Sequence, residues 1–266
     1  MVSFIKQFIP PIVLAWINRL AGSVNYYTGN YFSWEQAQAD ATGYDKSEII
    51  NKVYKSATKV KNGEAAFERD SVVYDVIEYN WSLVTACCLA RKPEGTFNVL
   101  DFGGSLGSSY LQNRQLIAKL TPYKWMIVEQ REFVEIGKKE FMDECLEFYG
   151  SIEEIKNNAC IDIVVLSSVL QYIESPYQLL VALAELSPKI IYIDRTPFIS
   201  SGCDRLTVQH VPRQIYKASY PAWFLSMEIF KGNMAKMGYE LLVEYNNSEK
   251  ANVDSLYKGL IFERID

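Results

Sequence analysis

The chain has 266 residues, 49% hydrophobic and 22% charged, which is typical of a soluble globular protein. Its 27 basic and 32 acidic side chains give a net charge of −5, which disfavours a nucleic acid as partner. The five cysteines form no C-x-x-C pair and His210 is the sole histidine, so the sequence predicts reduced thiols and no metal site.

Residues 1–22 are apolar, but Pro10 and Pro11 interrupt them, and the stretch is too short to span a bilayer. Apolar side chains at helical spacing after Pro11 predict one amphipathic helix. Docking on the protein's own core or on another subunit is the favoured interpretation, and peripheral contact with a membrane surface through Trp16 is the alternative. Because no cleavage site follows, we expect a cytoplasmic protein, either free or held at the inner face of the cell membrane.

Residues 1–95 are predicted to form a helical cap. A capping-box pattern over residues 33–36 opens a short helix, apolar spacing predicts a longer one over 49–60, and a third covers 79–90. Residues 68–71 form a charged connector. The strand signal is too weak for this segment to join a sheet.

Strands and helices alternate from residue 96 onward. Strands alternating with helices predict a parallel sheet covered on both faces, whereas the final two strands predict an antiparallel hairpin. We therefore expect an α/β fold, a Rossmann-like domain over 96–266 with a mainly parallel seven-stranded sheet and an antiparallel C-terminal hairpin. The predicted strands are 97–101, 124–129, 146–149, 161–167, 189–194, 239–245 and 256–263.

A glycine-rich turn, Asp101-Phe102-Gly103-Gly104-Ser105-Leu106-Gly107, follows the first of these strands. Strand, glycine turn and helix make a nucleotide site, because glycine lets a ligand approach the backbone and the helix start offers free N–H groups. The spacing does not fit the G-x-G-x-x-G turn of dinucleotide folds. It partly fits the acidic-x-G-x-G-x-G turn of S-adenosylmethionine (SAM) enzymes, with Ser105 in place of the middle glycine. A plain strand-to-helix turn is the alternative.

Polar residues end several later strands, where ligands bind in open α/β sheets. Glu129 lies about 20 residues beyond the turn, where an acid would bind ribose hydroxyl groups. A solvated glutamate is the alternative. The predicted cofactor-binding residues are Asp101, Gly103, Gly104, Ser105, Gly107, Glu129 and Ser167.

The connection after Asp194 is long for a βα loop, so we expect residues 195–221 to form an acceptor lid. His210 is the first candidate for a general base, because imidazoles titrate near neutral pH, and Asp194 is the second. A loop histidine bonded to the backbone is the alternative for His210, and an aromatic core anchor is the alternative for Trp223. The predicted acceptor-binding residues are Arg195, Tyr220 and Trp223.

Eight short motifs together resemble one known group of proteins. Over nearly its whole length the chain resembles bacterial methyltransferases encoded beside genes for surface-polysaccharide, O-antigen and lipopolysaccharide synthesis. The motifs are Pro10-Pro11, Gly43-Tyr44, Glu68-Arg69-Asp70, Leu100-Asp101-Phe102-Gly103-Gly104, Ser168-Val169-Leu170-Gln171-Tyr172, Asp194-Arg195-Thr196-Pro197, Tyr220-Pro221-Ala222-Trp223 and Tyr257-Lys258-Gly259.

The resemblance implies a class I methyltransferase fold, SAM as cofactor with S-adenosylhomocysteine as its product, and a glycan or another small polar acceptor. It also implies that the N-terminal cap covers the cofactor, with Arg69 and Tyr74 as candidates to bind its methionine carboxylate. A surface ion pair and a core tyrosine are the alternatives for these two residues. Tyr172 is a further candidate, beside Tyr220 and Trp223, to face the sulfonium charge.

Three other functions stay open at this stage. The chain could methylate a different small metabolite, or it could be a catalytically inactive subunit that binds partners of a polysaccharide assembly complex. Ser105 in the glycine turn leaves the second of these open. A nicotinamide enzyme is disfavoured by the glycine spacing.

Overall fold

The computed structural model describes residues 26–43, 46–92, 94–120, 122–156, 159–211 and 218–265. The predicted amphipathic helix within residues 1–22 lies outside these ranges. Its predicted contact with the core, a partner or a membrane therefore stays a prediction. Within them, no helix combines the length and the apolar character needed to cross a membrane.

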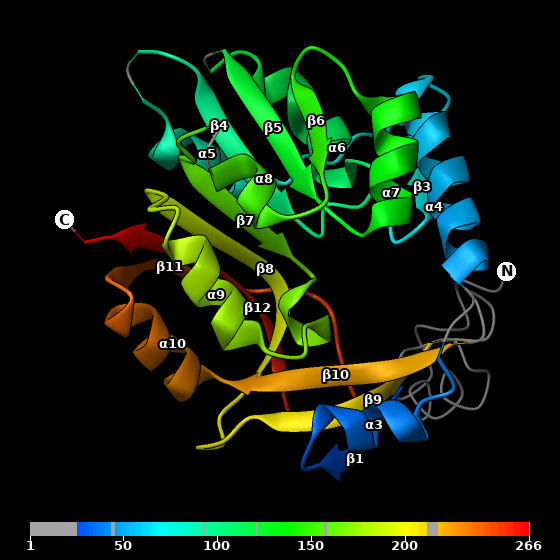
Figure 1. Cartoon of the computed structure of the whole chain (residues 1–266), viewed down its shortest axis with the longest axis vertical. Coiled ribbons are helices and arrows are strands. Elements are labelled where there is room, and N and C mark those ends of the chain that lie inside the picture. Colours follow the sequence, from blue (N-terminus) through cyan, green and yellow to red (C-terminus); the bar gives the residue numbers. More distant parts are fainter. Residues whose placement is uncertain are drawn as a thin grey trace, which may run out of the picture.

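A mainly parallel sheet forms the centre of the molecule, as predicted (Figure 1). Its seven principal strands run in the order β6-β5-β4-β7-β8-β12-β11, and β12 is antiparallel to both of its neighbours. This order and the antiparallel pair confirm the Rossmann-like class I fold. The strands are β4 (Phe97–Phe102), β5 (Tyr123–Val128), β6 (Leu146–Tyr149), β7 (Ile163–Ser167), β8 (Ile190–Ile199), β11 (Tyr239–Asn246) and β12 (Leu256–Arg264).

Helices cover both faces of this sheet (Figure 1). Apolar side chains alternate between the two faces along each strand; on β5, Trp125 and Ile127 belong to one core cluster, and Met126 and Val128 belong to the other. The first cluster lies beneath α4 (Lys46–Lys61), α5 (Trp81–Ala90), α6 (Ser108–Ile117) and α7 (Arg131–Ile136), which continues into the π-helical turn Gly137–Phe141. The second lies beneath α8 (Ile152–Lys156), α9 (Pro176–Ala184) and α10 (Met227–Lys236).

The described parts of residues 195–221 consist mainly of strands rather than the long loop expected from the sequence. β8 continues to Ile199, and β9 (Arg205–His210) then pairs antiparallel with β10 (Ser219–Ser226), which returns to the end of β8. The strand signal was weak because Pro197 and Pro221 lie within β8 and β10, and proline cannot donate a ladder hydrogen bond. Pairing with β12 supports the extended end of β8.

The N-terminal cap also contains strands, contrary to the expectation. β1 (Tyr26–Tyr31) pairs with β9 and so extends the main sheet. The charged connector at 68–71 belongs to a hairpin: Glu68 and Arg69 lie in β2 (Phe67–Arg69), and Asp70 and Ser71 form the turn to β3 (Val72–Tyr74). The predicted capping at the first helix is present: the Ser33 side chain accepts a hydrogen bond from the backbone of Gln36 at the start of α3 (Trp34–Asp40).

Candidate functional site

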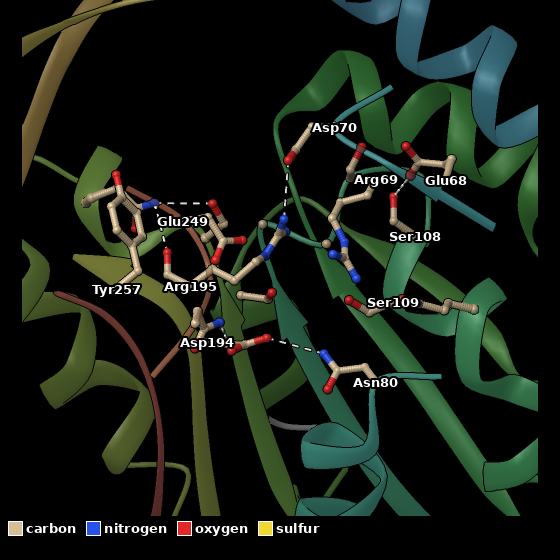
Figure 2. A pocket seen from close by; sticks show the side chains of 18 of the residues that line it. Glu68, Arg69, Asp70, Asn80, Ser108, Ser109, Asp194, Arg195, Glu249 and Tyr257 are labelled. Carbon is tan, nitrogen blue, oxygen red and sulfur yellow. Dashed lines mark hydrogen bonds and ion pairs between the residues drawn. The ribbon is translucent and has the colours of Figure 1, made fainter. Parts of the chain in front are cut away.

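A cavity of about 690 Å³ lies over the carboxyl ends of β4, β7 and β8 (Figure 2). The glycine turn forms part of its floor, and the β2–β3 turn, the start of α5 and the loop after β11 contribute to its rim. Parallel strands place their carboxyl ends at one edge, and this is where open α/β sheets bind ligands. The cavity therefore collects polar residues from segments far apart in the sequence.

The glycine turn fits only glycine at its first two positions. Gly103 has a φ of +74°, and a Cβ there would lie 2.6 Å from a methyl group of Val169. A Cβ on Gly104 would lie 2.6 Å from the carboxyl group of Asp101. Ser105 also takes a left-handed backbone, with a φ of +55°, so serine preserves the turn that glycine would form with less strain.

Asp101 supports this turn from below. Its carboxyl group is buried and accepts a hydrogen bond from the indole N–H of Trp125 at 3.0 Å. Burial raises the pKa of Asp101 to about 7; the Trp125 hydrogen bond opposes this rise, and the charge of Glu129 adds to it. Asp101 therefore exchanges its proton near neutral pH, beneath the backbone that faces the cavity.

Glu129 lies at the end of β5, beside the glycine turn, but it does not line the cavity. Its carboxylate accepts hydrogen bonds from the backbone N–H of Gln130, at 2.6 Å, and from the backbone of Ser105. Burial raises the pKa of Glu129, and these two hydrogen bonds oppose the rise. A carboxylate has room for further hydrogen-bond donors, so Glu129 keeps the capacity to bind hydroxyl groups.

Strained backbone positions concentrate around the cavity. Among the described residues, six that are not glycine have a left-handed φ, and five of these line the cavity. Such conformations cost about 1–3 kcal/mol each and persist where the surrounding structure enforces them, often at functional sites. The five are Asp70, Ser71, Ser105, Ser168 and Arg195.

Asp194 is the centre of a buried hydrogen-bond network on the cavity wall. Its carboxylate accepts from Asn247 Nδ2 at 2.7 Å, from the Tyr245 hydroxyl at 2.9 Å and from Asn80 Nδ2 at 3.2 Å (Figure 2). Ser82 closes the network, because its hydroxyl lies 2.7 Å from both Tyr245 and Asn80. These bonds fix the position of the carboxylate from two separate segments, the start of α5 and the end of β11.

An ion pair joins two sides of the cavity. The Arg195 guanidinium lies 3.3 Å from the carboxylate of Asp70, at the tip of the β2–β3 turn (Figure 2). In the same hairpin, the buried carboxyl group of Glu68 accepts hydrogen bonds from the Ser108 hydroxyl and the Ser71 backbone. Burial raises the pKa of Glu68. The hairpin is thereby attached both to the glycine-turn side and to the β8 side, and Arg69 lines the cavity between them.

Most of the predicted site residues line this cavity. They come from the ends of β4 and β7, the middle of β8, the start of β10, the end of β2 and the 3-10 turn after β7, and these segments are far apart in the sequence. These residues are Asp101, Gly103, Gly104, Ser105, Ser167, Asp194, Arg195 and Tyr220, together with Arg69 and Tyr172.

Four predicted residues and Tyr74 do not line the cavity. Glu129 is described above. Gly107 forms the N-cap of α6, where its φ of +94° favours glycine. Trp223 packs against Trp34, with ring centroids 6.3 Å apart, as its core-anchor alternative expects. Tyr74 stacks on Phe67.

His210 is separated from the cavity by the alternation of side chains along β9. The preceding residue, Gln209, lines the cavity, whereas His210 pairs with Tyr26 and its Nε2 lies 2.9 Å from the Thr28 hydroxyl. This placement gives no support to His210 as a general base. Asp194 does line the cavity, so it is the better placed of the two candidates.

Several polar residues of the cavity were missed from the sequence. Asn80 precedes a helix and Tyr245 and Asn247 end a C-terminal strand, so local pattern shows only a cap and a closing hairpin. Gln171 lies within the Ser168–Tyr172 motif, beside the predicted Tyr172, and this motif was the available signal for that part of the wall. Tyr245 and Asn247 reach the cavity because β11 pairs with β12 and β12 pairs with β8, and no local motif predicts this pairing.

Comparison with known proteins supports the fold. No model of a protein family matches the chain, and no curated protein sequence matches it either. Two solved structures of the N-terminal domain of EvdMO1 are similar. One, determined in the presence of S-adenosylhomocysteine and D-fucose, has a TM-score of 0.51 and 16% identity, over 84% of this chain and 98% of that one. The other, with S-adenosylhomocysteine bound, has a TM-score of 0.50 and 15% identity over the same shares.

A third similar structure is the Burkholderia thailandensis 1,6-didemethyltoxoflavin-N1-methyltransferase, with its substrate and S-adenosylhomocysteine. It has a TM-score of 0.47 and 14% identity, over 83% of this chain and 88% of that one. At these identities the likeness establishes the class I Rossmann-like fold alone.

Proposed function

We propose that the protein is a SAM-dependent methyltransferase that acts on a carbohydrate or a related small polar acceptor. The observation that carries this proposal is the glycine turn, which leaves its backbone open to the cavity at the carboxyl end of β4. The fold adds support, because both EvdMO1 structures contain S-adenosylhomocysteine. The resemblance to polysaccharide-associated enzymes favours a glycan precursor in the cytoplasm as acceptor.

The residues present fit this cofactor. A Cβ at Gly103 or Gly104 would collide with Val169 or with Asp101, so only glycine lets the turn lie this close to the strand ends with its backbone along the cavity. Glu129 is the candidate to bind the ribose hydroxyl groups and Arg69 the candidate to bind the methionine carboxylate. When bound, SAM supplies an electrophilic methyl group on a sulfonium ion. The protein's task is then to hold cofactor and acceptor in line.

The acceptor side of the proposal relies on Asp194 and Arg195. Asp194 is held by three hydrogen bonds, so its carboxylate keeps a fixed position to orient an acceptor hydroxyl group and to receive its proton. Arg195 lines the same cavity and offers hydrogen-bond donors. The D-fucose of the EvdMO1 structure supports a sugar as acceptor class.

An inactive, partner-binding protein is the main alternative. The geometry of the glycine turn disfavours this alternative, because Ser105 takes the left-handed backbone that the turn requires. Strained backbone positions are frequent at functional sites, so the strained serine supports a site in use. The shape of the turn therefore favours a working cofactor site.

Calorimetric titration with S-adenosylhomocysteine tests the proposal. We expect one molecule to bind, and NAD to show no binding. Glu129→Ala should weaken binding about tenfold to a hundredfold, because hydrogen bonds to a charged group are lost. Glu132→Ala is the matched control, since this exposed acid lies one turn further along the chain. A wild-type protein that does not bind S-adenosylhomocysteine would contradict the proposal and favour the partner-binding alternative.

A further inference from the structure

Two amide side chains of the cavity wall each have an oxygen without a hydrogen-bond partner among the described residues. Gln171 lies in the 3-10 turn after β7 and is 2% exposed, and Asn247 directly follows β11. Both residues line the cavity, yet the two oxygens are shielded from bulk water. Unpartnered buried acceptors are rare, because the lost hydrogen bond to water is not replaced.

The orientation of both amides follows from their nitrogens. Asn247 Nδ2 donates to Asp194 Oδ1 at 2.7 Å, and Gln171 Nε2 lies 3.2 Å from the Ser168 hydroxyl and 3.4 Å from the carbonyl oxygen of Arg195. Turning the Asn247 amide over would set its oxygen against the Asp194 carboxylate. Turning the Gln171 amide over would set its oxygen against the Arg195 carbonyl oxygen, whereas the Ser168 hydroxyl suits either orientation. The unpartnered atoms are therefore acceptors, which O–H or N–H groups of a ligand or of a water satisfy.

Four tyrosines, from β1, the 3-10 turn, β10 and β12, form the adjoining part of the wall: Tyr27, Tyr172, Tyr220 and Tyr257. The rings of Tyr172 and Tyr220 meet edge to face at 5.3 Å, and the hydroxyls of Tyr27 and Tyr257 lie 2.7 Å apart. The backbone N–H of Asn247 donates to the carbonyl oxygen of Tyr257 at 2.8 Å, so amide and aromatic wall are neighbours. Faces of aromatic rings attract weakly positive C–H bonds.

We propose that Gln171 and Asn247 bind the acceptor, which is a sugar whose ring packs against these tyrosines, and that small rotations of the two side chains on binding bring the amide oxygens to two of its hydroxyl groups, which donate to them. This proposal rests on the proposed function, since it assigns the acceptor side of the same cavity. A sugar combines a C–H face with several O–H donors. A flat or aliphatic acceptor without such donors would leave both oxygens unpaired, and the site discriminates against it for that reason.

The test uses the full chain saturated with S-adenosylhomocysteine. Ligand-observed NMR titrations with D-fucose, methyl galactoside and methyl glucoside should show binding of at least one sugar. Gln171→Met and Asn247→Leu should each raise its Kd about tenfold, the usual effect of one lost hydrogen bond at a buried acceptor. Affinity for S-adenosylhomocysteine should stay at the wild-type value in both. Gln115→Met is the matched control, because Gln115 lies outside this cavity.

Deoxy derivatives of the bound sugar provide a measurement that needs no variant. Wild-type protein should lose about tenfold in affinity for each derivative that lacks a bound hydroxyl. Each such derivative should bind the variant that lacks the matching amide no more weakly than the parent sugar does, and should still bind the other variant about tenfold more weakly. Equal affinity for every deoxy derivative, or the absence of sugar binding beside intact cofactor binding, would overturn this proposal alone. Absence of cofactor binding would overturn the proposed function.

Discussion

At the scale of single residues, the cavity combines a rigid floor with carboxyl groups of altered acidity. Asp101 has no room to move, because Gly104 packs directly on its carboxyl group. Burial favours its neutral form, while the indole of Trp125 stabilises the charged one. The balance places its protonation in the range where the protein is expected to work.

Asp101→Asn should change how stability depends on pH. The folded pKa of about 7 exceeds the usual value of 3.8, so between these values the folded protein binds more protons than the unfolded chain. The free energy of unfolding must then fall as pH rises through this window, by up to about 1.4 kcal/mol per pH unit from this group. Above pH 7 the contribution levels off.

Denaturant unfolding from pH 4.5 to 8 measures this dependence. The variant keeps an oxygen to accept from Trp125, so we expect it to fold and to show a flatter decline than the wild type. Since burial also raises the pKa values of Glu68 and Glu129, some slope should persist. Parallel curves for the two proteins would exclude Asp101 as the source of the effect.

At the scale of elements, β1 is attached to the molecule on two sides. It pairs with β9 on one, and on the other the side-chain amide of Asn252 bonds both the backbone N–H and the carbonyl oxygen of Tyr27, at 2.7 and 2.8 Å. Asn252 thus satisfies backbone hydrogen-bonding groups on the open side of this edge strand, as a neighbouring strand would. Because Tyr27 belongs to the tyrosine wall, this attachment also positions part of the cavity.

We expect Asn252→Ala to loosen β1 without unfolding the central sheet. Two lost hydrogen bonds of about 0.5–1.5 kcal/mol each should accelerate amide exchange in β1 by roughly tenfold or more. Exchange in β4 and β7 should stay as in the wild type. Ser255→Ala is the control from the same loop, since its hydroxyl bonds only the nearby carbonyl of Val253. Equal exchange of β1 in both variants would refute the role of Asn252.

At the scale of the whole molecule, the described residues build a sheet covered on both faces and a cavity at one edge. Two core clusters, one per face, hold the sheet, and the β1-β9-β10 extension continues from the end of β8 beside the cavity. Figure 1 shows this extension crossing below the carboxyl edge of the main strands. Cofactor floor and tyrosine wall thus come from different parts of one continuous sheet.

A chain that begins after Gly22 should fold and bind S-adenosylhomocysteine like the full protein. We predict that the N-terminal amphipathic segment is peripheral, because residues from 26 onward already supply the described strands, both core clusters and the described cavity lining. Thermal melting and calorimetry of the truncated protein measure this. An insoluble product, or a melting temperature far below that of the full chain, would instead place this segment in the core.

Local sequence was sufficient for the central α/β pattern and for the glycine turn. Buried strands such as Trp125–Val128 are continuous apolar runs, and a turn that needs left-handed backbone requires glycine or a tolerant small residue. These signals come from consecutive residues, so no tertiary contact is needed to detect them. The same holds for Asp194 and Arg195, which follow directly from the end of a predicted strand.

Only the tertiary structure determines which strands form the edge of the sheet and which residues line the acceptor side of the cavity. Pro197 and Pro221 hide the strand character of the end of β8 and the start of β10. The tyrosine-rich β1 becomes a strand because β9 and Asn252 pair with it. Side-chain alternation on β9 then turns Gln209 toward the cavity and leaves His210 outside it. Such outcomes depend on pairing partners about 180 to 230 residues away in sequence, as for Thr28 with His210 and Tyr27 with Tyr257, which no local pattern encodes.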